Sequence, residues 1–147
     1  MIGDKPNGVN INHEVGALFP ESARDELLKS SAQLAISLDG DADRVILTDE
    51  KGNIVDGDQI LGILAADLKA QGKLSKDTFV TTLMSNIGLE LAMKEKGINV
   101  LTCGVGDREV VDLMRKENLN FGGEQSGHIV FRDMTTTGDG IIAALSV

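Results

Sequence analysis

An acidic loop between two apolar runs is the feature that most restricts how this chain can fold. Asp39, Asp41 and Asp43 stand at alternate positions in the loop. The runs before and after them, 34–38 (Leu-Ala-Ile-Ser-Leu) and 45–48 (Val-Ile-Leu-Thr), are short, apolar and partly β-branched, which is typical of buried strands. The sequence therefore predicts two strands joined by a sharp turn at which three carboxylates converge.

Carboxylates that converge need positive charge nearby. Two of them about 4 Å apart repel by about 1 kcal/mol in water and about 4 kcal/mol near a protein surface. Mg²⁺ takes oxygen ligands in near-octahedral geometry, and one carboxylate at every second residue can fill one face of that octahedron. Arg44 follows directly, and its planar guanidinium suits bidentate binding of phosphate. We predict Mg²⁺ at Asp39, Asp41 and Asp43, next to a phosphate ester.

Three other interpretations of this loop stay open at this stage. The first is a solvated acidic turn whose side chains point apart. The second is a calcium-binding module, because the three aspartates and Glu50 occupy positions 1, 3, 5 and 12 of an EF-hand loop; Arg44, however, replaces the glycine expected at position 6. The third is an aspartyl-phosphate phosphatase of the HAD type, with Asp39 as nucleophile and Asp41 as acid/base.

Strand and helix signals alternate along the chain, which predicts an α/β fold with mixed sheets. The turn 51–53 predicts a hairpin and hence an antiparallel pair. The other expected elements are helices that start at Pro20–Ser22 and at Asp56–Asp58, a strand over 79–84, a helix from the cap Ser85 to Gly97, a strand over 98–101, and a helix that carries 110–114.

We expect two small α/β/α domains. The stretch 70–77 is polar and has no periodicity, so we place the boundary there, with a metal-binding domain over 1–73 and a sugar-binding domain over 74–147. The turn-rich start and the apolar run 141–147 at the end suggest a piece of a longer protein.

Composition excludes several functions. The chain has 147 residues, a formal charge of −9, and neither Trp nor Tyr, which argues against binding nucleic acid or an anionic membrane surface. It has no signal peptide and no apolar run near the ~18 residues of a membrane span, so we expect a cytoplasmic protein. Cys103 is the single cysteine, which excludes an internal disulfide, and we expect a small buried side chain there.

A second group of polar residues lies in the run 121–128, Phe-Gly-Gly-Glu-Gln-Ser-Gly-His. Glu124, Ser126 and His128 stand at every second position, so in an extended chain they would share one face. A carboxylate, a hydroxyl and an imidazole on one face suit a polyhydroxylated ligand such as a sugar. A polar turn leading into the strand 129–131 is the equally weighted alternative.

The run 103–110 follows an expected strand and starts a helix. Its Gly-Val-Gly does not match a dinucleotide fingerprint, because Glu109 replaces the third glycine. We predict a tight turn with Asp107 as a cap and Arg108 beside it, where the helix start meets an anionic or polar ligand. The run 135–140 is expected to be a cap and turn, and His13 to be structural.

Taken in order, the motifs DGDADR (39–44), VGDR (105–108), GEQSGH (123–128) and TTTGDG (135–140) make the chain similar to the α-D-phosphohexomutase superfamily. The likeness covers essentially the whole chain. It is strongest to the phosphoglucosamine mutase branch, because Gln125 stands where enzymes acting on mannose or glucose phosphates typically have Met.

The resemblance implies a fragment of a four-domain bacterial isomerase that interconverts glucosamine 6-phosphate and glucosamine 1-phosphate through a phosphoserine and a sugar bisphosphate, a step toward UDP-N-acetylglucosamine. Asp39, Asp41 and Asp43 would hold Mg²⁺, and Arg44 would steady the phosphoryl group. The sugar would contact the turn Gly106, Asp107 and Arg108 together with Glu124, Ser126 and His128. The serine loop and the last phosphate-binding loop are not in this sequence, so we expect the fragment to be inactive without the remaining domains.

Overall fold

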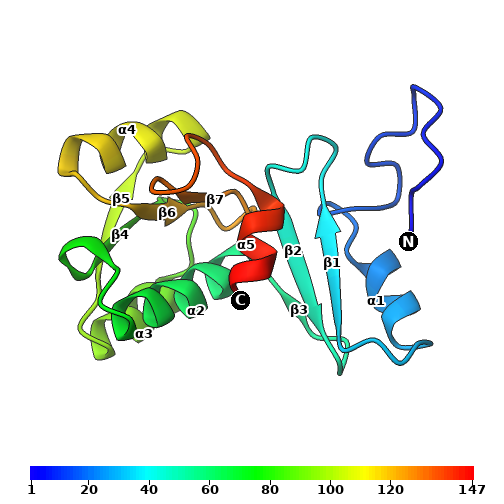
Figure 1. The fold of residues 1–147 in the computed structure, drawn as a ribbon, viewed down its shortest axis with the longest axis horizontal. Coiled ribbons are helices and arrows are strands. Elements are labelled where there is room, and N and C mark those ends of the chain that lie inside the picture. The colour runs from blue at the N-terminus through cyan, green and yellow to red at the C-terminus, as the bar shows by residue number, and fades with distance from the viewer.

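The computed structural model describes residues 1–147 and contains two β-sheets with helices packed beside them (Figure 1). The elements, in chain order, are α1 (Glu21–Leu27), β1 (Leu34–Leu38), β2 (Val45–Asp49), β3 (Ile54–Val55), α2 (Gly57–Ala70), a short 3₁₀ helix (Ser75–Asp77), β4 (Thr78–Thr82), α3 (Ile87–Glu95), β5 (Asn99–Cys103), α4 (Asp107–Glu117), β6 (Phe121–Gly123), β7 (Ile129–Phe131) and α5 (Gly140–Ser146).

The first sheet has the order β1-β2-β3 and is antiparallel throughout. The acidic loop joins β1 to β2, with Leu38 opposite Val45 at its base. The predicted arrangement of strand, turn and strand is therefore confirmed, and so is the hairpin at 51–53 between β2 and β3. Since strands flank the acidic loop, the helix–loop–helix of an EF-hand is excluded.

The second sheet has the order β5-β4-β6-β7 and is mixed, as predicted. β4 runs parallel to β5 and β6, whereas β6 and β7 form an antiparallel hairpin. In Figure 1, α4 covers one face of this sheet, and α2 and α3 cover the other. Neighbouring residues on β4 point to opposite faces, so Phe79 packs in the cluster with α2 and Val80 packs in the cluster with α4.

The larger hydrophobic core links the two sheets. Ile60 and Leu61 of α2 are fully buried in one cluster with Phe79 and Phe121 of the second sheet. The same cluster continues to Val45 and Leu47 of β2 and to two alanines of α5. Helix α2 thus packs on the second sheet. The expected boundary near residue 73 had placed this helix in the first domain. We propose a boundary ahead of α2, near residue 56.

Caps explain where two of the helices start. Asp56 caps α2 as predicted, in a reciprocal capping box in which Asp56 accepts from the Gln59 N–H at 3.0 Å. Helix α3 is capped by Asn86, which accepts from Gly88 N–H at 2.7 Å, and not by Ser85. The Ser85 hydroxyl is instead hydrogen-bonded to the Thr81 hydroxyl.

None of the helices has the length and apolar character needed to cross a lipid bilayer.

Candidate functional site

The acidic loop is held in a tight turn by its own backbone. Asp39 N–H donates to the Arg44 carbonyl at 3.4 Å, and Arg44 N–H donates to Asp39 Oδ1 at 3.1 Å. Ala42 has a φ of +62°, a left-handed conformation that costs a residue with a Cβ. Such strain persists only where the surroundings fix it, and it is common at functional sites. Gly140 N–H supplies one restraint by donating to the Ala42 carbonyl at 2.9 Å.

The turn gathers the three carboxylates as predicted. Oxygens of Asp39, Asp41 and Asp43 all lie within 4.8 Å of one another. Asp43 Oδ1 is buried without a hydrogen-bond partner. Burial, followed by the hydrogen bond and the negative charge of Asp39, raises the pKa of Asp43. Crowded carboxylates with an unused buried oxygen are a donor set that fits a hard divalent cation.

Arg44 connects this loop to the second sheet. Its backbone forms an isolated antiparallel bridge with His128, and Val45 N–H donates to the Gly127 carbonyl at 3.0 Å. The Arg44 guanidinium lies on the loop that carries the carboxylates, and its Nε–H is buried without a partner. A planar guanidinium with an unpaired donor suits an anionic ligand. Such a ligand could also contact a cation bound by the three carboxylates.

The run 124–128 is a hairpin turn between β6 and β7 and not an extended segment. The expectation of three side chains sharing one open face was therefore wrong. Glu124 is 6% exposed, and its two carboxylate oxygens accept from Gly106 N–H at 3.1 Å and from the Ser126 hydroxyl at 3.3 Å. Ser126 is half-buried. Glu124 thus fixes the hairpin to the turn at residue 106, and Ser126 is the member of the set with open surface.

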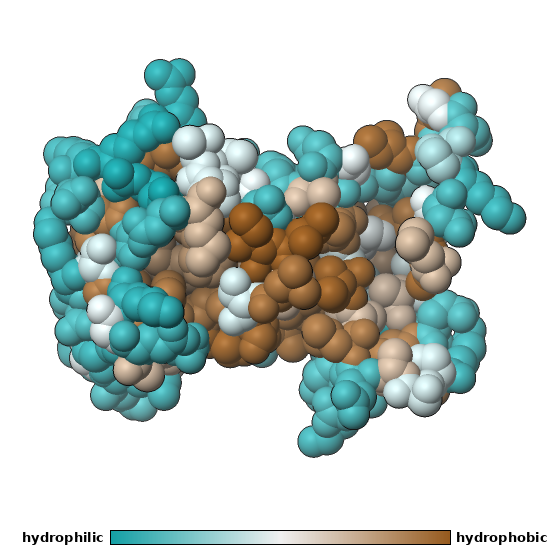
Figure 2. Space-filling model, in the orientation of Figure 1, coloured by the Kyte–Doolittle hydropathy of each residue, from teal (hydrophilic) through white to brown (hydrophobic).

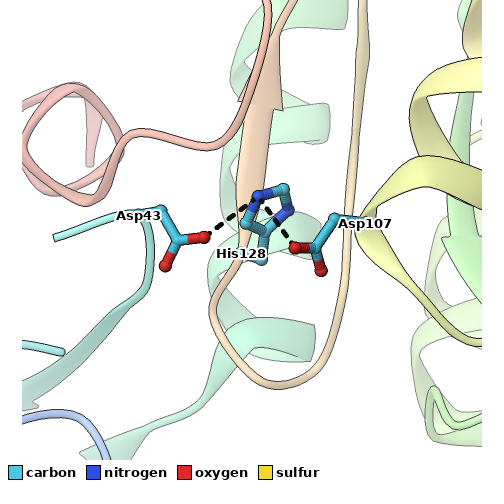
Figure 3. A group of neighbouring side chains, drawn as sticks. All are labelled: Asp43, Asp107 and His128. Carbon is cyan, nitrogen blue, oxygen red and sulfur yellow. Dashed lines mark ion pairs between the residues drawn. The ribbon is translucent and has the colours of Figure 1, made fainter. Parts of the chain in front are cut away.

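His128 is fully buried, so in this geometry its ring has no surface for a sugar. Its Nε2 accepts from Gly138 N–H at 3.2 Å and faces Asp43 at 3.5 Å and Asp107 at 3.8 Å (Figure 3). His128 therefore lies between the acidic loop and the start of α4. This placement could not be predicted, because no local pattern pairs His128 with Gly138.

The turn 104–107 presents polar groups at the start of α4. Gly106 occupies the cap position with a φ of +131°, so Asp107 is the first residue of the helix and not its cap. The Asp107 side chain is 44% exposed and that of Arg108 is 91% exposed, with an ion pair to Asp112 at 3.5 Å. Both side chains are accessible to a ligand; the predicted cap at Asp107 was wrong, and ligand binding at this turn stays a prediction.

Two glycines, Gly57 and Gly138, allow these segments to meet. A Cβ on Gly57, at the start of α2, would lie 2.6 Å from the Gln125 carbonyl oxygen and 2.6 Å from Gly127 N. Gly57 N–H donates to that same carbonyl at 3.1 Å. A Cβ on Gly138 would collide with the His128 ring. Both close approaches join segments that are far apart in the sequence, so local patterns do not predict them.

Asp43 joins the two predicted groups into one site. It belongs to the set with Asp39 and Asp41, and also to a set with Asp107 and His128 whose ligand atoms again lie within 4.8 Å of one another. The site therefore combines the acidic loop, an arginine, and a polar turn with accessible hydroxyl, carboxylate and guanidinium groups. That combination can hold a metal-bound phosphate beside a polyhydroxylated ligand.

Comparison with protein families and curated proteins gives consistent results. Residues 56–147 match the model for phosphoglucomutase/phosphomannomutase, alpha/beta/alpha domain III. The phosphoglucosamine mutase of Bdellovibrio bacteriovorus is 60% identical over all of this chain, and that of Sorangium cellulosum is 56% identical over 99% of it. The chain spans 32% of the first relative's length and 30% of the second's, about a third.

Solved structures show the same fold. A phosphoglucomutase/phosphomannomutase family protein from Burkholderia thailandensis matches 89% of this chain and 30% of its own, with a TM-score of 0.76 and 24% identity. N-acetylphosphoglucosamine mutase from Aspergillus fumigatus, solved in complex with GlcNAc-6P and magnesium, matches 95% of this chain and 38% of its own, with a TM-score of 0.66 and 20% identity.

Proposed function

Since this chain belongs to the phosphoglucomutase/phosphomannomutase family, we propose that it supplies the metal loop and part of the sugar-binding surface of a phosphoglucosamine mutase. The reaction would interconvert glucosamine 6-phosphate and glucosamine 1-phosphate. The observation that carries the proposal is the position of Asp43, which links the gathered carboxylates to the polar turn at Asp107. The names of the Bdellovibrio and Sorangium relatives support the choice of amino sugar.

Asp39, Asp41 and Asp43 would hold Mg²⁺, because they offer hard oxygen ligands and one of them has a buried oxygen without a partner. Bound there, the ion would draw negative charge away from the oxygens of a transferring phosphoryl group. Arg44 would bind the same group through its guanidinium and so favour the charge distribution of the transition state. A phosphoserine from another domain, as the family resemblance implies, would complete the site.

The sugar would lie against the groups that remain accessible beside the loop. These are Ser126 of the hairpin together with Asp107 and Arg108 at the start of α4. Glu124 would fix Gly106 and Ser126 in position and accept a sugar hydroxyl with a remaining lone pair. His128, buried behind Asp43 and Asp107, would accept from Gly138 N–H and so hold the segment that contains Gly138 against the site.

A chimera tests the proposal directly. Residues 1–147 would replace the matching third of the Bdellovibrio phosphoglucosamine mutase, to which they are 60% identical. We expect the chimera to convert glucosamine 6-phosphate to glucosamine 1-phosphate when primed with the sugar bisphosphate. A folded chimera without this activity would contradict the proposal.

The isolated chain gives the complementary test. With the phosphoserine domain missing, we expect no turnover of glucosamine 6-phosphate by purified residues 1–147, even with Mg²⁺ and the bisphosphate primer present. Turnover by the isolated chain would show that it needs neither the serine nor the other domains.

A further inference from the structure

Asp107, the first residue of α4, carries an open carboxylate. Its side chain is 44% exposed, and it forms no ion pair with a lysine or an arginine. The basic group that faces it is His128 Nε2 at 3.8 Å. That nitrogen accepts a hydrogen bond from Gly138 N–H, so it has no hydrogen to donate to Asp107. The carboxylate is therefore available to a ligand that donates hydrogen bonds.

The other carboxylates around the polar turn have partners or lie outside the site. Both oxygens of Glu124 accept hydrogen bonds within the turn, and Asp112 forms ion pairs with two arginines at 3.5 and 3.6 Å. Asp43 belongs to the proposed metal loop. Glu109 shares the first turn of α4 with Asp107, but it is in neither group whose ligand atoms lie within 4.8 Å of one another. Asp107 is thus the accessible carboxylate that remains within the site.

Asp107 also lies close to the acidic loop. One of its oxygens and one oxygen of Asp43 are within 4.8 Å of each other. Figure 3 shows the two carboxylates directed at the His128 ring from opposite sides. The wider surface over α4 is largely hydrophilic, whereas hydrophobic residues gather over α5 (Figure 2). A polar group held by Asp107 would therefore be the immediate neighbour of a group bound at the acidic loop.

Glucosamine phosphates differ from glucose phosphates in the group on C2, which is a primary amine in the first and a hydroxyl in the second. A primary amine is largely protonated at neutral pH, and the ammonium group is a cation that only donates hydrogen bonds. Hydrogen bonds between charged groups are about twice as strong as those between neutral ones. A carboxylate without a partner cation therefore favours the amino sugar.

The place of C2 in the sugar ring fits the position of this carboxylate. C2 is bonded to C1, whose oxygen gains or loses the phosphoryl group in the proposed reaction. When the C1 oxygen faces the acidic loop, the amine on C2 lies beside that loop. The Asp107 carboxylate, within 4.8 Å of an Asp43 oxygen, is in the right place to accept from that amine.

We propose that Asp107 binds the ammonium group of the glucosamine phosphates and so selects an amino sugar over the corresponding hydroxyl sugar. This inference rests on the proposed function and adds a specificity-determining residue to it. A neutral hydroxyl on C2 would form a weaker hydrogen bond and would leave the charge of Asp107 without a partner cation.

The substrate preference of the Bdellovibrio chimera tests this role. Asp107→Asn should lower kcat/KM for glucosamine 6-phosphate by about 10- to 100-fold, the range for a lost hydrogen bond to a charged group. The value for glucose 6-phosphate should stay close to that of the unsubstituted chimera, because the asparagine oxygen still accepts from a hydroxyl. If glucose 6-phosphate turns over too slowly, its inhibition constant against glucosamine 6-phosphate gives the same comparison.

Glu109→Gln is the matched control, because it removes the same charge from the same turn of α4. It should leave the preference for glucosamine 6-phosphate unchanged. A general loss of structure would lower both kcat/KM values, so equal losses for the two substrates in Asp107→Asn would overturn the proposal, as would an unchanged preference. A selective loss in Glu109→Gln would assign the amine to Glu109 and would also overturn it.

The same assays separate this inference from the proposed function. A folded chimera that converts neither sugar phosphate would contradict the proposed function and this inference with it. A chimera that converts glucosamine 6-phosphate, and whose preference survives Asp107→Asn, would overturn the role of Asp107 alone.

Discussion

The contact between Gly57 and the hairpin 124–127 makes Gly57→Ala an informative substitution. A Cβ at Gly57 would lie 2.6 Å from the Gln125 carbonyl oxygen and from Gly127 N, and closer still to the Glu124 carbonyl. All of these are backbone atoms, which cannot move aside as a side chain could. Overpacking of this kind costs about 1–3 kcal/mol. The hydrogen bond from Gly57 N–H to Gln125, worth about 1 kcal/mol, would be weakened as well.

Gly62 in the same helix is the matched control. The nearest atoms to a Cβ there are Leu89 Cδ1 at 3.1 Å and Met93 Cε at 3.5 Å, both ends of flexible side chains. Gly62→Ala should therefore leave stability unchanged or raise it by up to about 1 kcal/mol through helix propensity. Gly57→Ala should lower it by about 2–3 kcal/mol, a fall in melting temperature of roughly 4–12 °C for a chain of this size.

Thermal and urea unfolding followed by circular dichroism would measure both variants against the unsubstituted chain. Equal stability of Gly57→Ala and Gly62→Ala would contradict this prediction, because it would mean that the hairpin does not pack against the start of α2. A fall for both variants would point to a general intolerance of α2 to alanine and would equally refute it.

Three further predictions concern other parts of the chain. Hydrogen bonds from Asn53 lower the pKa of Asp49, so its contribution to stability is present above about pH 4 and is lost as the pH falls; Asp49→Asn should therefore lower the melting temperature at pH 7, and the gap should close below about pH 4. Burial raises the pKa of the Cys103 thiol, so iodoacetamide should alkylate it more slowly in the folded chain than in urea at pH 8, and equal rates would contradict this. In the chimera, Arg44→Lys should lower kcat by about 100-fold, since an ammonium cannot replace the planar guanidinium, and an unchanged kcat would remove Arg44 from the transition state.

The acidic loop was predictable because its signals are local. Alternating carboxylates between two apolar runs define a strand, a turn and a strand, and the turn itself brings Asp39, Asp41 and Asp43 together. The caps at Asp56 and Asp139 were predictable for the same reason, since each serves a helix that begins at the next residue. Local chemistry fixes such features without reference to the rest of the fold.

The site around His128 was not predictable, because contacts between distant segments create it. Period-two spacing suggested that Glu124 and His128 share an open face, but the hairpin between β6 and β7 turns both side chains inward. The packing of α2 against the second sheet was missed because the polar stretch 70–77 looked like a domain boundary. The family match, which starts at residue 56, includes α2 with that sheet.

A paramagnetic titration tests whether the acidic loop holds a divalent cation beside the polar turn. Mn²⁺, which shares the oxygen-ligand preference of Mg²⁺, would be added to the ¹⁵N-labelled chain. Broadening should centre on the amides of 39–44, extend to Asp107 and His128, and reverse when Mg²⁺ is added in excess. Binding should be weaker than micromolar, because the proposed phosphoserine ligand would come from another domain. Broadening centred on another acidic group, such as Asp112, or no broadening at 39–44, would contradict a cation site in this loop.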